Sequence, residues 1–182
     1  GDGCHGQGDE HAGPTGGTMK TASLAVAAVF SSMQSGRDLH FDGEVVWSAS
    51  SGGVEVFDTD GRSIAAVRDL PSRDATSIGW FDDSLTVGTV DGGFSWTQGA
   101  WRQVGHARHV VAVTELGLVF RDGSSWPDDG FRGFTVEAVA WQGELIRFTN
   151  DGRMHTADRV VDLPGPVADA SVVNGEIRIA LH

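Results

Sequence analysis

Residues 141–145 read WQGEL, and the same pattern occurs as FDGEV at 41–45 and VNGEI at 173–177. Each copy contains an apolar residue, a polar residue, glycine, glutamate and a strand-favouring residue. Asp-Gly and Asn-Gly pairs are typical of tight β-hairpins, because both central residues need a positive φ. The copies therefore predict structural repeat positions at Gly43, Gly143 and Gly175. Looser copies, WFDDSL at 80–85 and TELGL at 114–118, extend the series.

Strand-like runs rich in branched residues follow each hairpin, and most then reach a second glycine-rich turn. No helical period occurs after residue 36, so the chain is predicted to be all-β. Four short strands in each repeat are typical of β-propeller blades. We expect about five blades. Their predicted bounds are 37–71, 72–106, 107–136, 137–166, and a composite of 167–182 with roughly 18–35.

The last predicted blade has only two strands in its C-terminal part, which would leave an exposed edge. We therefore expect N-terminal strands to complete this blade and close the ring. A β-sandwich built from the same strands is the alternative fold.

The composition fits one globular domain, with 182 residues of which 40% are apolar. We assign residues 1–17 to a flexible Gly/His-rich tail and 18–182 to the propeller. The formal net charge of −12 argues against nucleic-acid binding. The apolar run 24–30 is too short for a transmembrane segment. Residues 19–30, MKTASLAVAAVF, also resemble the start of a secretory signal, although a strand or short helix is the preferred interpretation.

The stretch TVDGGFSW at 89–96 resembles the Asp-box (BNR-like) motif, with Asp91, Gly93 and Trp96 at its Asp, Gly and aromatic positions. The longer run SLTVGTVDGGFSWTQGAWRQV at 84–104 is similar to the two-component-regulator propeller repeat. Both resemblances imply a β-propeller in which the Asp accepts turn N–H bonds and the aromatic ring packs between sheets.

Asp-box sialidases use a tyrosine nucleophile, and this chain contains no tyrosine. That mechanism cannot operate here, and no acidic pair stands out as a two-carboxylate glycosidase site. The sequence therefore leans towards a protein without enzymatic activity.

Partner or ligand contacts are predicted at aromatic and imidazole side chains in irregular stretches. Trp101 and Trp126 could stack on a sugar or a protein surface. The run RDGSSWPDDGFRGF at 121–134, which includes Phe131, is the preferred contact loop. His106 and His109 lie in an expected loop between blades, where they could face a ligand.

The N-terminal tail contains Cys4, His5 and His11, whose side chains are ligands that zinc or copper prefers. Their spacing matches no established motif, and a flexible linker is the alternative interpretation. No other cofactor is expected.

The sequence thus predicts a non-catalytic binding or assembly module with a protein partner. We expect a secreted, periplasmic or cell-envelope location. Carbohydrate binding or glycan hydrolysis is the second hypothesis, and metal handling through the tail is the third.

Overall fold

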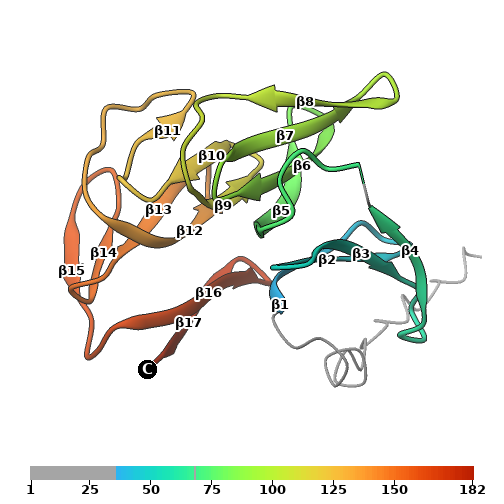
Figure 1. The fold of residues 1–182 in the computed structure, drawn as a ribbon. Helices are drawn as coiled ribbons and strands as arrows, with labels where there is room; N and C mark the ends of the chain where they lie inside the picture. Colours follow the sequence, from blue (N-terminus) through green and yellow to red (C-terminus); the bar gives the residue numbers. More distant parts are fainter. Residues whose placement is uncertain (1–35, 68) are drawn as a thin grey trace, which may run out of the picture.

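The computed structural model describes residues 36–67 and 69–182. These residues form five antiparallel sheets that follow one another around a common axis, as the ribbon shows (Figure 1). Strand order within each sheet is chain order. The described residues contain no helix that is long and apolar enough to span a membrane.

Each sheet is a blade, and blades 1 to 5 are numbered along the chain. Their strands are β1 (Gly36–Phe41), β2 (Val46–Ser50), β3 (Gly53–Phe57) and β4 (Ser63–Val67) in blade 1; β5 (Ala75–Phe81), β6 (Ser84–Thr89), β7 (Gly92–Thr97) and β8 (Ala100–Val104) in blade 2; β9 (Val110–Thr114), β10 (Gly117–Phe120) and β11 (Ser125–Trp126) in blade 3; β12 (Thr135–Trp141), β13 (Glu144–Thr149), β14 (Arg153–His155) and β15 (Val160–Asp162) in blade 4; and β16 (Val167–Val173) and β17 (Glu176–Leu181) in blade 5.

The first strand of every blade lies innermost and lines a central channel of about 480 Å³. Strand β1 contacts β5, β5 contacts β9, β9 contacts β12, and β12 contacts β16. A crevice of about 320 Å³ lies between β16 and β1, where the last described blade meets the first. This radial arrangement is a β-propeller, which confirms the predicted fold and excludes the sandwich.

Apolar side chains fill the space between successive blades. Phe94 and Val54 pack together between blades 1 and 2, and Phe120 packs with Phe81 between blades 2 and 3. Phe148 packs with Ile179 between blades 4 and 5. Because a propeller blade buries both faces against its neighbours, its middle strands are apolar on both sides, as the fully buried β10 illustrates.

The predicted hairpins occur where the first strand of a blade turns into the second. Gln142 and Gly143 both have positive φ in a two-residue loop, as do Asn174 and Gly175. The first copy differs, because four residues separate Phe41 from Val46. There the Asp42 carboxylate accepts N–H bonds from two loop residues and from the Trp47 indole, which stabilises a longer loop around Gly43.

Two blades depart from the four-strand repeat. Blade 3 has three strands among the described residues, and the irregular segment 127–134 occupies the place of its fourth. Blade 5 has two strands, β16 and β17. The N-terminal segment at roughly 18–35 that we expected to complete blade 5 lies outside the described residues, as does the tail 1–17.

The two glycines of the Asp-Gly-Gly turn have distinct roles in this packing. Gly92 has a φ of +143° and begins β7 immediately after the turn. A Cβ on Gly93 would lie 2.0 Å from Cδ2 of the fully buried Leu118 in blade 3. Glycine at 93 therefore lets blades 2 and 3 approach closely.

Candidate functional site

The segment 127–134 forms an irregular loop because its own side chains satisfy its backbone. Pro127 has no N–H group to donate to a strand ladder. The carboxylates of Asp128 and Asp129 accept N–H bonds from Gly130 and Phe131 at 3.0 and 3.2 Å. Such local Asx turns compete with strand pairing. The loop then returns towards blade 3, where Gly133 N donates to Asp122 O at 3.2 Å.

A groove of about 700 Å³ lies between this loop and blade 4. Its apolar lining includes Leu116 from blade 3, Pro127 and Phe131 from the loop, and Leu145 from β13. Its polar lining includes two charged side chains of opposite sign, Asp129 and Arg147, which form an ion pair across the groove wall.

Arg147 is the unusual member of this set, because only 3% of it is exposed. Its Nη2 donates to Asp129 Oδ2 at 2.6 Å, and its guanidinium carbon lies 4.7 Å from the Phe131 ring centroid. Its Nε has no hydrogen-bond partner among the described residues. Burial by itself would raise the pKa of Asp129, but the hydrogen bonds from Arg147 and Phe131 N lower it, so the net pKa of this carboxyl lies below its ordinary value.

The Phe131 ring is held from two sides. Arg147 lies on its face, and His155 of β14 meets its edge, with ring centroids 5.1 Å apart and an interplanar angle of 68°. In the same loop, the Asp128 carboxylate accepts two hydrogen bonds from the Arg132 guanidinium, at 2.9 and 2.8 Å. Both partners of that second ion pair are exposed, so it contributes little to stability.

The structure brings together two of the other predicted site residues. His106 packs edge-on against Trp126, with centroids 5.5 Å apart, and it also contacts Phe120. Trp126, at the end of β11 and directly before the loop 127–134, remains 40% exposed. The predicted contact loop therefore carries both Trp126 and Phe131.

Trp101 and His109 do not line the groove between the loop 127–134 and blade 4. Trp101 packs edge-on against Trp96 at 5.2 Å and donates from Nε1 to Asp69 at 3.3 Å. His109 lines a shallow pocket of about 470 Å³. Burial and the nearby Arg121 cation lower the pKa of His109. His106 and His109 thus have different neighbours.

The residues of the Asp-box-like turn also differ from the role that the resemblance implies. Asp91 accepts a hydrogen bond from Ser72 Oγ at 2.8 Å, whereas the turn itself is closed by Thr89 Oγ1, which donates to Gly92 O at 2.9 Å. Trp96 is exposed beside Trp101, and Phe94 is the ring of this strand that packs between blades.

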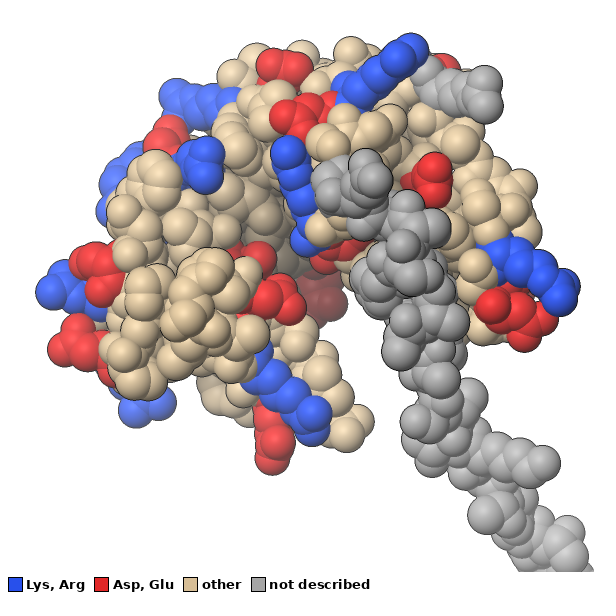
Figure 2. Space-filling model, turned by 60° about the horizontal axis from the view of Figure 1, so that its bottom comes forward, with Lys and Arg blue, Asp and Glu red and all other residues tan. Residues whose placement is uncertain are grey.

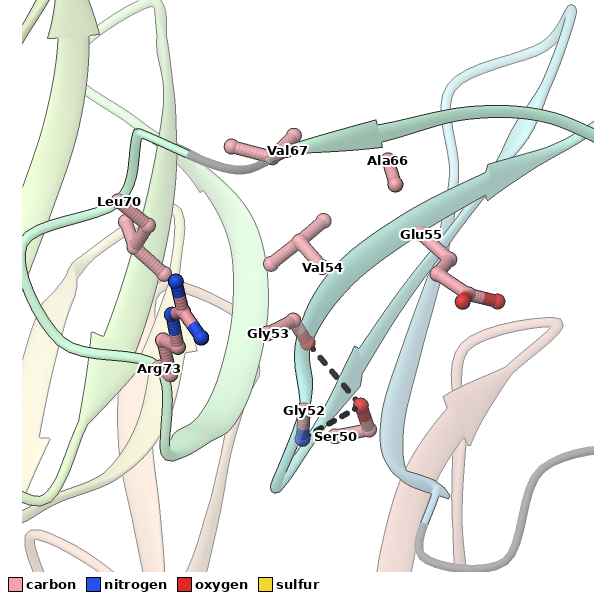
Figure 3. Close-up of a pocket in the computed structure, with 9 residues that line it drawn as sticks. All are labelled: Ser50, Gly52, Gly53, Val54, Glu55, Ala66, Val67, Leu70 and Arg73. Carbon is pink, nitrogen blue, oxygen red and sulfur yellow. Dashed lines mark hydrogen bonds between the residues drawn. The ribbon is translucent and has the colours of Figure 1, made fainter.

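A smaller pocket of about 300 Å³ lies beside blade 1, with Val54, Val67 and Leu70 in its lining (Figure 3). The Ser50 hydroxyl in this pocket accepts from Gly52 N at 3.1 Å and donates to Gly53 O at 3.2 Å. This polar group therefore closes the β2–β3 turn.

The channel contains acidic side chains that our sequence reasoning missed. A register shift in each inner strand gives one equivalent position in all five blades, occupied by Asp38, Ser77, Ala112, Glu137 and Asp169. The three acidic members line the channel in blades 1, 4 and 5. The face in Figure 2 is hollowed near its middle, and acidic side chains lie at the edge of the hollow. Aligning the inner strands on their hairpins would superpose Ser77, Glu137 and Asp169, each four residues before the end of its strand. Asp38 and Ala112 lie three and two residues before that end, so the full set needs the observed register.

Two of these carboxyls titrate near neutral pH. Burial raises the pKa of Asp38 to about 7, against the opposing effect of N–H bonds from Ile78 and Leu39. Burial raises the pKa of Glu137 to about 8, and the negative charges of Asp38 and Asp169 add to that effect. Among the described residues no group of three or more His, Cys, Asp or Glu side chains could hold a metal ion. Cys4, His5 and His11 lie outside the described residues, so the metal site in the tail stays a prediction.

Comparisons with known proteins identify the fold alone. No protein-family model and no curated protein sequence matches the chain. Similar solved structures include the computationally designed Ika8 protein, at 16% identity and a TM-score of 0.55 over 79% of this chain. The WD40 β-propeller domain of Doa1 has 16% identity and a TM-score of 0.53 over 78% of this chain. BBS1N, crystallised in complex with ARL6DN, has 15% identity and a TM-score of 0.51 over 75%.

The chain covers 57%, 58% and 58% of these three structures, respectively. It is a β-propeller by its sheet arrangement and by these likenesses.

Proposed function

We propose that this protein is a non-catalytic binding or assembly module whose contact surface is the groove between blades 3 and 4. The observation that carries the proposal is an apolar groove built around Phe131, with Leu116, Pro127 and Leu145 in its wall. Concave apolar surfaces with a few fixed polar groups are typical binding sites. A protein partner that inserts an apolar side chain would bury this lining.

Two further points support a protein as the partner. Loops held on a rigid propeller scaffold are common contact surfaces, and the exposed Trp126 at the end of β11 directly precedes the loop 127–134. The similar propeller BBS1N was crystallised with a protein, ARL6DN. We place the module in a secreted or cell-envelope location, which fractionation of the source cells would test.

The test compares the full chain with two variants in affinity capture from the native extract. Leu116→Asp places a charge in the groove from a loop position, and Ile64→Asp places the same charge on exposed β4 of blade 1. A partner that wild type and Ile64→Asp retain and Leu116→Asp loses, and that rebinds after purification in calorimetry, supports the proposal. Equal retention by all three proteins, or no specific partner of the wild type, would overturn it.

A carbohydrate ligand is the second candidate, because Trp126 is partly exposed and its indole is held by His106. Such a ring can stack on a sugar face. A glycan array with wild type and Trp126→Ala tests this candidate. Binding that disappears in the variant supports it, whereas an array without binding excludes it.

A further inference from the structure

The buried guanidinium of Arg147 has a donor, Nε–H, without an acceptor among the described residues. Asp129 accepts from Nη2, and Nε has no acceptor among the described residues although it is buried in the groove wall. A buried donor without an acceptor destabilises the folded chain, so any group that supplies one is favoured there.

The Phe131 ring lies over this guanidinium. Phe131 comes from the loop 127–134, whereas Arg147 belongs to the central part of β13. Loops open at lower free energy than the strands they join. The ring can therefore turn aside and open the groove beside the guanidinium, where an acceptor approaches Nε in the guanidinium plane while Arg147 stays in place.

The charge around the groove selects the kind of acceptor. The Arg147 cation is already paired with Asp129, Asp128 is paired with Arg132, and Glu144 also lines the groove. A carboxylate or phosphate ligand would meet these negative charges at close range. A neutral carbonyl oxygen can accept from Nε without that repulsion.

Glu144 in the lining and the net charge of −12 favour positive charge on the ligand. The apolar wall of Leu116, Pro127 and Leu145 favours a large apolar side chain. An extended peptide backbone supplies carbonyl groups between such side chains.

On the basis of the proposed binding function, we propose that the groove accepts an extended peptide segment that displaces Phe131. A backbone carbonyl of the segment accepts a hydrogen bond from Arg147 Nε. An aliphatic or aromatic side chain of the segment takes the place of the Phe131 ring, and a flanking Lys or Arg residue faces Glu144.

The test selects random dodecapeptides displayed on phage against the full-length chain and measures the affinity of the best synthetic peptide. We expect enriched sequences with a large apolar residue next to Lys or Arg. Because the closed ring competes with the peptide, Phe131→Ala should tighten binding about fivefold or more. The matched control is Phe134→Ala, since Phe134 also stacks on an arginine, Arg121, but at an exposed place.

The nuclear magnetic resonance signal of the Arg147 Nε–H group provides a readout that needs no substitution at Arg147. Peptide addition should shift this signal downfield, and replacing the accepting amide of the peptide by an ester should reduce the shift. Unchanged or weaker binding by Phe131→Ala, or an Nε–H signal that does not respond, would overturn the inference. If no peptide is selected but a Leu116-dependent partner is captured, the proposed function stands and this inference fails.

Discussion

The equivalent position of the five inner strands is occupied by two kinds of side chain. Ser77 and Ala112 occupy the equivalent position in blades 2 and 3, whereas Glu137, Asp169 and Asp38 occupy it in the consecutive blades 4, 5 and 1. Small side chains at this position allow close packing between blades 2 and 3, which we call the packed half. Carboxyls at this position bring charge next to the channel in blades 4, 5 and 1, which we call the titratable half. The same backbone framework therefore supports both halves.

The packed half is made by glycines and fully buried apolar side chains. At the joint between blades 2 and 3, a Cβ on Gly88 would lie 2.6 Å from Val110 Cγ1, and Gly93 makes room for Leu118. At the joint between blades 5 and 1 a crevice remains, with Asp38 and Asp169 in its lining. The comparison indicates that the joint between blades 2 and 3 is packed more closely than the joint between blades 5 and 1.

The largest expected effect comes from removing a buried side chain in the packed half. Leu118→Ala should cost about 2–5 kcal/mol of unfolding free energy, because Leu118 is fully buried. Leu39→Ala, beside the crevice and only partly buried, should cost clearly less. Urea unfolding of both variants measures the two losses of unfolding free energy. Equal losses would contradict the claim that the joint between blades 2 and 3 is packed more closely than the joint between blades 5 and 1.

Adding a methyl group at the same joint should have the next largest effect. Gly93→Ala forces the buried Leu118 to move and should cost about 1–3 kcal/mol. Gly165→Ala is the matched control, because no atom lies within 4 Å of its added Cβ. Unfolding free energies of the two variants are compared, and a silent Gly93→Ala would contradict the close approach of blades 2 and 3.

The titratable half should make stability depend on pH. Burial raises the pKa of Asp38 from 3.8 to about 7 and that of Glu137 from 4.5 to about 8. A carboxyl with a higher pKa in the folded chain stabilises it fully below the unfolded pKa, and that stability is lost as pH rises through the folded pKa. The unfolding free energy should therefore increase as pH falls from about 8, the folded pKa of Glu137, towards the unfolded values near 4.

Glu137→Gln isolates one of these carboxyls, because the amide does not titrate. We expect the slope of unfolding free energy against pH to decrease by about 1.4 kcal/mol per pH unit between the unfolded and folded pKa of this carboxyl. Ser77→Ala, at the equivalent position of blade 2, should leave the slope unchanged. Identical slopes in wild type and Glu137→Gln would contradict the claim that the Glu137 carboxyl makes stability depend on pH.

The smallest expected effect concerns a single hydrogen bond between blades 4 and 5. Trp141 Nε1 donates to Gly175 O at 2.7 Å, and Trp141→Phe should cost about 0.5–1.5 kcal/mol. Hydrogen exchange of the amides at 174–177 should accelerate, while exchange in β10 stays slow. Equal acceleration in both blades would indicate a global rather than a local change.

Turn chemistry made much of the fold predictable. Asn174-Gly175 and Gln142-Gly143 adopt the positive φ angles that two-residue hairpins need, and the first-to-second strand turns mark the blades. The longer loop at Asp42 was harder to foresee, because its side chain closes the turn through three hydrogen bonds. The missing fourth strand of blade 3 follows from Pro127 and two adjacent Asx turns, whose combined effect depends on the neighbouring blade.

The candidate site was only partly predictable. Its loop and Phe131 stand out as aromatic residues in an irregular stretch. Arg147 does not stand out, because arginine is rarely buried and its partner Asp129 lies 18 positions away in sequence. Only the fold brings this cation beneath Phe131.

The order of blades along the chain has a consequence for how the ring assembles. Every sheet is made of contiguous residues, so blades 1 to 4 can each form from local segments during synthesis. The approach of β16 to β1 instead brings together opposite ends of the described chain, and such distant encounters cost the most chain entropy. Ring closure is then the late step of folding, and it occurs where three carboxyls must come close together.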